Sequence, residues 1–167
     1  ASKELTDGTN NYNGTLSPEQ IKLLSHKTLR PNNTISVTYL DMSGDEQQSR
    51  ECNKLYGTET TLSADWYVAE GTVSFAHPIS VTGDVHIILK DGAVVNVGTA
   101  ESPVNDYAIG NNNTSCSINI YGQSTGANHG QLNVYSTSSG ICSMNGDVNY
   151  SSVRITASAS GVSGIWA

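Results

Sequence analysis

The sequence predicts an all-β protein of the parallel β-helix type, in which short strands coil repeatedly and stack on one another. Two observations predict this fold: three short strands joined by tight turns, and the return of those strands later in the chain. The strands lie within residues 79–97, where apolar residues alternate with polar ones and Gly83-Asp84 and Asp91-Gly92 interrupt them. Period-two alternation broken by such dipeptides is typical of strands and turns. We interpret this stretch as one coil of a solenoid.

A solenoid must repeat, and the strands of this coil have later counterparts. The central strand aligns with residues 116–120 and again with residues 151–155, which predicts two inward ladders: Ile87–Ile118–Val153 and Leu89–Ile120–Ile155. The third strand repeats as Val95 with Leu132 and Val97 with Val134, and a small residue before isoleucine recurs at 108–109, 140–141 and 164–165. Loose alternation alone fits any β protein, but three strand types returning in one order favour the solenoid.

Residues 1–60 are expected to form a cap over the first coil. Residues 1–16 are polar and resemble a flexible lead-in, and Ser17-Pro18-Glu19-Gln20 has the features of a helix start. A hairpin is expected from Thr34–Leu40 and a second strand at about residues 47–56. The domain boundary therefore falls near residue 60, with coils from residue 61 to residue 167.

The last coil stops while a further strand has only begun, at Gly164–Ala167. No polar capping element follows, so we expect that the coils belong to a longer protein or that a partner covers this edge. An exposed strand edge also favours edge-to-edge self-association.

Charge and apolar content exclude some partners. Lys and Arg number 8 against 15 Asp and Glu, giving a net charge of −7, and there is no basic run. Nucleic-acid binding depends on neutralising phosphates, so it is not expected. No apolar run approaches the length of a membrane span.

Three cysteines cannot all pair within one chain. Cys116 lies in phase with Ile118 and is expected to point inward, whereas Cys52 and Cys142 are harder to place. Buried free thiols are the default expectation, because buried cysteine behaves as a small hydrophobe, but a disulfide is left open. No pair of Cys or His has zinc-site spacing.

Four segments resemble a known family: residues 39–52 (YLDMSGDEQQSREC), 64–75 (ADWYVAEGTVSF), 79–97 (ISVTGDVHIILKDGAVVNV) and 118–134 (INIYGQSTGANHGQLNV). Over about residues 35–167 the chain is similar to β-helical adhesin or carbohydrate-binding domains of gut-bacterial surface proteins. This resemblance implies a right-handed parallel β-helix and an extracellular, cell-surface setting. It brings no catalytic motif.

The predicted register places a candidate glycan-binding surface on the outer side of the central strands. Its residues combine one aromatic ring, two cations and an amide: Tyr121, Lys90, Arg154 and Asn119. Rings form platforms for sugars, and the two cations would suit an acidic sugar. A second candidate set on the neighbouring strand is Gln131, Asn133 and Tyr135. The alternative is an ordinary solvated sheet face.

Catalysis and cofactors are not expected. Asp84 and Asp147 both follow glycine and precede valine, but the predicted register separates them, so no two acids share an outward column as glycoside hydrolysis would require. Calcium at Asn145 and Asp147 is weakly suggested by their oxygen atoms. Three hypotheses remain: a non-catalytic module for polysaccharide binding or adhesion, a structural stalk, or a fragment of a polysaccharide lyase or glycosidase.

Overall fold

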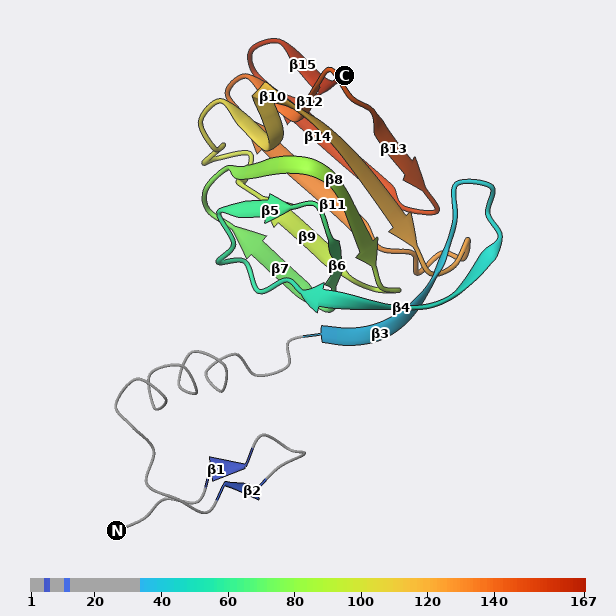
Figure 1. Ribbon diagram of the computed structural model, residues 1–167. Helices are drawn as coiled ribbons and strands as arrows, with labels where there is room; N and C mark the ends of the chain where they lie inside the picture. The colour runs from blue at the N-terminus through green and yellow to red at the C-terminus, as the bar shows by residue number, and fades with distance from the viewer. Residues whose placement is uncertain (1–4, 7–10, 13–33) are drawn as a thin grey trace. The chain divides into compact units, whose positions relative to one another are not determined.

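The structure is a computed structural model that describes residues 5–6, 11–12 and 34–167 (Figure 1). The chain divides into two compact units, residues 1–33 and 34–167. In the first unit, β1 (Leu5–Thr6) pairs antiparallel with β2 (Asn11–Tyr12). The helix expected from residue 17 lies outside the described residues.

Residues 34–167 are all-β, as predicted, with no helix in this part of the chain. The strands are β3 (Thr34–Leu40), β4 (Glu46–Lys54), β5 (Thr61–Ser63), β6 (Trp66–Ala69), β7 (Thr72–Phe75), β8 (Ile79–Leu89), β9 (Val94–Val97), β10 (Tyr107–Gly122), β11 (Gln131–Ser136), β12 (Ser139–Met144), β13 (Val148–Ser151), β14 (Arg154–Ala159) and β15 (Ser163–Trp166). A nine-stranded sheet has the order β15-β12-β10-β8-β6-β4-β3, with β13 beside β10 and β5 beside β8. A four-stranded sheet has the order β14-β11-β9-β7.

From β6 to β12 the chain alternates between these two sheets strand by strand. After β12, β13 and β15 join the nine-stranded sheet and β14 joins the four-stranded sheet. Strands of successive passes pair in parallel in both sheets, whereas β3 and β4 pair antiparallel (Figure 1). Parallel strands joined by crossings through a second sheet bury one face of each sheet against the other. Alternating apolar residues on both sheets supply that interior.

The main core lies between the two sheets, and its largest members are almost completely buried. Ile118 and Ile120 of β10 and Val134 of β11 have no exposed surface. Fully burying such a side chain contributes about 1.5–3 kcal/mol. Two predicted repeats are confirmed: Leu132 lies beside Val95, and Ile141 lies between its counterparts in β10 and β15.

The predicted ladders through the central strand were wrong. Ile118 lies beside Val85 and Ile120 beside Ile87, two residues away from the predicted partners. A slip of two residues keeps every side chain on the same face, so the apolar pattern cannot detect it. The register shift between Gly110 and Cys116 of β10 accounts for the irregular spacing that misled the alignment.

The last predicted rung was also wrong, because residues 148–159 form two strands in different sheets. β13 places Val148 beside Ile118, the chain then turns at Ser152 with a positive φ of 57°, and β14 joins β11. Ile155 consequently lies beside Leu132, and neither Ile155 nor Val153 extends the central ladder. A serine in the left-handed region leaves no glycine signal for this turn.

The predicted hairpin is confirmed as β3 and β4, and it belongs to the same compact unit as the sheets. Its buried side chains form a second, smaller cluster with outward residues of the nine-stranded sheet: Val37, Tyr39, Cys52, Val68, Ile88 and Tyr121. Part of the sheet's outer face is therefore covered. All three cysteines are buried and free, which confirms the default expectation, and burial raises the pKa of the Cys52 thiol to about 11.

Candidate functional site

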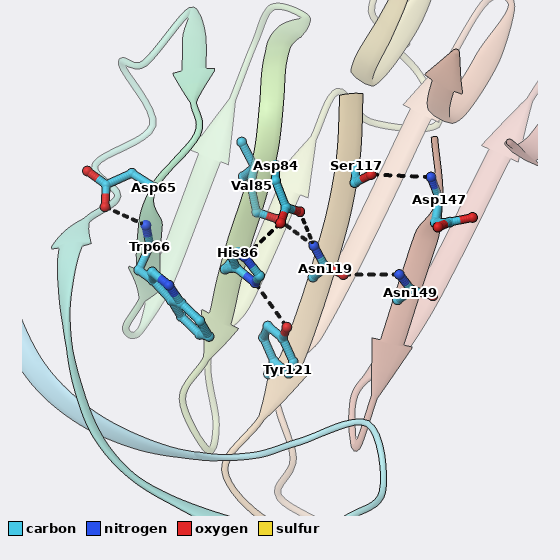
Figure 2. Close-up of polar contacts among 10 residues, drawn as sticks. All are labelled: Asp65, Trp66, Asp84, Val85, His86, Ser117, Asn119, Tyr121, Asp147 and Asn149. Atoms are coloured by element: carbon cyan, nitrogen blue, oxygen red, sulfur yellow. Dashed lines mark hydrogen bonds and ion pairs between the residues drawn. The ribbon is translucent and has the colours of Figure 1, made fainter. Parts of the chain in front are cut away.

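An aromatic layer covers one end of the outer face that the sequence singled out (Figure 2). The rings of Trp66 and His86 stack with centroids 4.2 Å apart and an interplanar angle of 7°. Tyr39 of the hairpin contacts the Tyr121 ring edge-on at 5.0 Å, and the Arg50 guanidinium lies 4.6 Å above the Trp66 ring. Only 7% of Tyr121 is exposed, so the expectation of an open ring there was wrong. The hairpin occupies the space that a sugar would need.

The amide of Asn119 is the centre of a polar network beside this layer (Figure 2). Its Nδ2 donates to Oδ1 of Asp84 at 2.7 Å, and its Oδ1 accepts from Nδ2 of Asn149 at 3.0 Å. His86 connects Asp84 to Tyr121, with Nε2 at 3.3 Å from Oδ2 of Asp84 and Nδ1 at 2.9 Å from the Tyr121 hydroxyl. These hydrogen bonds connect β10 to the strands on either side. Because only 8% of Asn119 is exposed, its side chain is poorly placed to contact a ligand.

The two Gly-Asp-Val aspartates share an outward column, contrary to the sequence prediction. Val85 and Val148 both lie beside Ile118, so Asp84 and Asp147 flank Ser117 on neighbouring strands. The Asp147 backbone amide donates to Oγ of Ser117 at 3.5 Å (Figure 2). The misplaced register of β13 was the reason for treating these acids as separate.

The two predicted cations do not meet. Nζ of Lys90 is 2.6 Å from Oε1 of Glu70, whose other oxygen is 3.1 Å from Nζ of Lys54. Hydrogen bonds from Lys90 and Lys54 lower the pKa of the Glu70 carboxyl. Arg154 lies in the other sheet, beside Gln131. The predicted column of Lys90, Asn119, Tyr121 and Arg154 is therefore not assembled.

The second predicted set lies together on the outer face of the four-stranded sheet. Gln131, Asn133 and Tyr135 of β11 are half-buried and alternate with buried apolar residues. Asn133 belongs to a row of polar side chains, one from each strand, that we call the polar ladder: Ser74, Asn96, Asn133 and Thr156. Nδ2 of Asn133 donates to Oδ1 of Asn96 at 3.0 Å, and Nδ2 of Asn96 donates to Oγ of Ser74 at 3.4 Å.

Two hollows share Ala100 and Tyr135, and Ser74 and Asn96 of the ladder line the larger one. The larger, of about 550 Å³, is lined by Ser74, Phe75, Ala76, Asn96, Gly98, Thr99, Ala100, Glu101, Ser102 and Tyr135. The smaller, of about 170 Å³, is lined by Ala100, Pro103, Tyr135, Ser136, Ser158, Ala159 and Ser160. We call the two hollows together the groove. Glu101 is the only charged residue among these lining residues.

The loop at residues 98–104 forms one wall of the groove and is held by its own hydrogen bonds. The Thr99 amide donates to the Ser102 carbonyl at 3.0 Å, and the Val104 amide donates to the Tyr135 carbonyl at 3.0 Å. Gly98 has φ of 68°, and a Cβ there would lie 2.7 Å from that same carbonyl oxygen. Glycine is therefore required where the chain leaves β9 to build this wall.

Ser136, at the end of β11, borders the smaller hollow. Its hydroxyl is the one buried side-chain polar atom that lacks a hydrogen-bond partner within residues 34–167. An unsatisfied buried hydroxyl lowers the free energy of unfolding by about 1–3 kcal/mol, so Ser136 destabilises the fold.

The sequence prediction missed the groove's contributions from β7, β9 and the loop: Ser74, Asn96 and Glu101. A signal for the ladder was present, because Val95-Asn96-Val97 and Leu132-Asn133-Val134 share the order apolar–Asn–apolar and their alignment is confirmed. The wall has no such signal, since its shape depends on the conformation at Gly98 and on bonds to β11.

No group of three or more His, Cys, Asp or Glu side chains within the described residues could hold a metal ion. In the same residues, no helical segment has the length and hydrophobicity needed to cross a membrane. Comparison of the chain with protein-family models, curated proteins and solved structures finds no match.

Proposed function

We propose that residues 34–167 form a right-handed parallel β-helix that binds polysaccharide without cleaving it, as an extracellular module of a bacterial surface protein. The observation that carries the binding proposal is the groove, where Tyr135 borders both hollows, two positions after Asn133 of the polar ladder. Parallel pairing in successive passes supports the β-helix, and the family resemblance of the sequence supports the cell-surface setting.

The groove has the chemistry that sugars require. A pyranose offers an apolar C–H face and a rim of hydroxyls that both donate and accept. Tyrosine supplies a flat apolar ring with a polar tip, while amides and hydroxyls supply both kinds of hydrogen bond. Four of the seven residues predicted from sequence lie on this one sheet face: Gln131, Asn133, Tyr135 and Arg154.

A glycan array of plant, mucin and microbial polysaccharides tests this proposal, followed by titration of the best ligand. A shallow open site predicts micromolar to millimolar dissociation constants. Tyr135→Ala should weaken binding at least tenfold. Tyr150→Ala is the matched control, because Tyr150 is 55% exposed on β13, away from the groove, and should leave binding unchanged. Absence of binding to any glycan would reject the proposal and leave the structural-stalk hypothesis.

A second candidate function is glycoside hydrolysis on the other sheet, and the shared column of Asp84 and Asp147 favours it. Their backbones are two strand spacings apart, about 9–10 Å, near the carboxyl separation of inverting glycosidases. The test is the release of reducing ends from the glycans that bind, with Asp84→Asn and Asp147→Asn as controls. Release that both variants abolish would establish an enzyme and reject the non-catalytic proposal.

A further inference from the structure

We infer that the groove selects a neutral, unbranched oligosaccharide that lies across the strands and contacts about one sugar unit per strand. This inference rests on the proposed function and adds the direction, length and charge of the ligand. Three features of the four-stranded face carry it: the strands that line the groove, the hydrogen bonds of the polar ladder, and the position of Glu101.

The direction follows from the strands that supply the lining. Ser74 comes from β7, Asn96 from β9, Tyr135 from β11 and Ser158 from β14, so the groove crosses all four strands of the sheet. Adjacent strands lie about 4.7–4.9 Å apart, which is close to the length of one pyranose unit in an extended chain. A linear chain in this direction would therefore repeat with nearly the same period as the strands beneath it.

The ladder leaves hydrogen-bonding capacity on successive strands. Each asparagine amide nitrogen has two hydrogens, and Asn133 and Asn96 each use one toward the preceding strand. Asn96 lines the larger hollow, and Asn133 lies next to it on β11, two positions before Tyr135. One N–H therefore remains inside the groove and one at its border, and each amide oxygen can accept at least one further bond. A sugar hydroxyl, which donates and accepts at once, matches this pair of groups.

The charge of the groove favours a neutral ligand. Glu101 is the one charged lining residue, and Arg154, which could have offset it, is absent from the lining. The whole chain has a net charge of −7. A uronic acid bound across the four strands would bring its carboxylates toward Glu101, where like charges repel. A neutral sugar in the groove therefore replaces the acidic sugar that the sequence analysis suggested for a site at Lys90 and Arg154.

A length series tests the inference by calorimetry or NMR titration, with β-1,4-linked gluco- and manno-oligosaccharides of one to six units as neutral probes. Oligogalacturonides of the same lengths are the acidic probes. The affinity for one of the neutral series should rise up to about four units and then level off. Acidic oligomers should bind at least tenfold more weakly, and Glu101→Gln, which preserves shape, should reduce that difference several-fold.

A blocking variant tests the direction of the chain. Ser158→Trp fills the smaller hollow at one end of the groove, so the length at which affinity levels off should fall by about one unit while dimer binding stays unchanged. Acidic oligomers that bind more tightly, or an affinity that no longer rises beyond one unit, would overturn the inference but leave glycan binding intact. Loss of all glycan binding on the array would instead reject the proposed function.

Discussion

The hydroxyl of Tyr121 lies 2.9 Å from Nδ1 of His86, beneath the hairpin formed by β3 and β4. Burial, with a smaller contribution from Tyr39, raises the pKa of Tyr121 from 10.0 to about 12. This phenol thus belongs to the interior of the protein, and two predictions concern it.

The first prediction is a loss of stability in alkali. Between pH 10 and about 12 the folded protein keeps the Tyr121 proton while the unfolded chain releases it, so the free energy of unfolding falls as the pH rises. A shift of this size corresponds to roughly 3 kcal/mol. Denaturant titrations from pH 8 to 12 should show a shallower decline for Tyr121→Phe. Since Cys52 and Tyr67 also have raised pKa values, the difference between the two proteins is the informative quantity. Parallel curves would contradict this assignment.

The second prediction separates stability from binding. Tyr121→Ala removes a buried ring from the cluster of Tyr39, Trp66 and Ile88, and should lower the free energy of unfolding by about 3–5 kcal/mol. Glycan affinity, measured at a temperature where the variant is folded, should stay within twofold of the original. A selective loss of affinity with unchanged stability would return the binding site to the nine-stranded sheet.

The third prediction uses two buried serines as a matched pair. Ser143 donates its hydroxyl to the Cys116 carbonyl at 2.5 Å, whereas the Ser136 hydroxyl has no partner in the described part of the chain. Ser143→Ala should therefore destabilise the fold by about 1–2 kcal/mol, while Ser136→Ala should be neutral or stabilising. Thermal melts of the two variants decide this, and equal losses would mean that Ser136 has a partner after all.

The fourth prediction tests the register of β8 and β10. Asp84 and Ser117 lie side by side on neighbouring parallel strands, so cysteines at these positions have Cα atoms within disulfide range. The pair Asp84→Cys and Ser115→Cys corresponds to the register expected from sequence, whereas in the structure Asp84 pairs with Ser117. An offset of two residues on a regular ladder separates the Cα atoms by about 8 Å, which is too far for a disulfide. Thiol titration after mild oxidation should show a disulfide in the first pair only; the reverse result would restore the sequence-derived ladder.

The fifth prediction concerns association through the outermost strands. Within residues 34–167, β15 and β14 are the last strands of their sheets, and the nearby side chains of Val162, Ile165 and Trp166 are 72%, 39% and 43% exposed. Unpaired strand edges with apolar neighbours favour pairing between copies. Sedimentation velocity should show dimers that grow with concentration, and Ile165→Lys should suppress them. A monomer at every concentration would count against this prediction.

Much of the fold could be predicted because apolar alternation reports which face of a strand is buried. The pairing of Val95 with Leu132 and the hairpin of β3 and β4 both followed from that pattern. The pattern has a period of two, however, so it cannot separate Ile118 beside Val85 from Ile118 beside Ile87. The register shift between Gly110 and Cys116 fixes that choice, and period-two alternation does not report it. The bend at Ser152, which sends the chain from β13 to β14, likewise gives no recognisable signal.

The candidate site was predicted less well, for a related physical reason. Alternation assigned Tyr121 correctly to the outer side of its sheet, but a residue that faces outward can still be covered by a distant segment. Tyr39, more than eighty positions earlier in the chain, packs on Tyr121 with ring centroids 5.0 Å apart. Tyr135, which also faces outward, stays partly exposed and borders both hollows. Exposure of an outward residue is a property of the whole fold, which local patterns do not report.

The order of strands also determines how this protein would respond to mechanical force. β3 and β15 occupy opposite edges of the nine-stranded sheet, and the bonds between neighbouring strands point along the line from one edge to the other. Tension applied at residues 34 and 167 would load these bonds one strand at a time, as a zipper opens, instead of shearing many at once. If the protein is anchored at one end and binds a glycan as proposed, it would then lengthen in small steps at low force. Under flow it would extend gradually before the bound glycan dissociated.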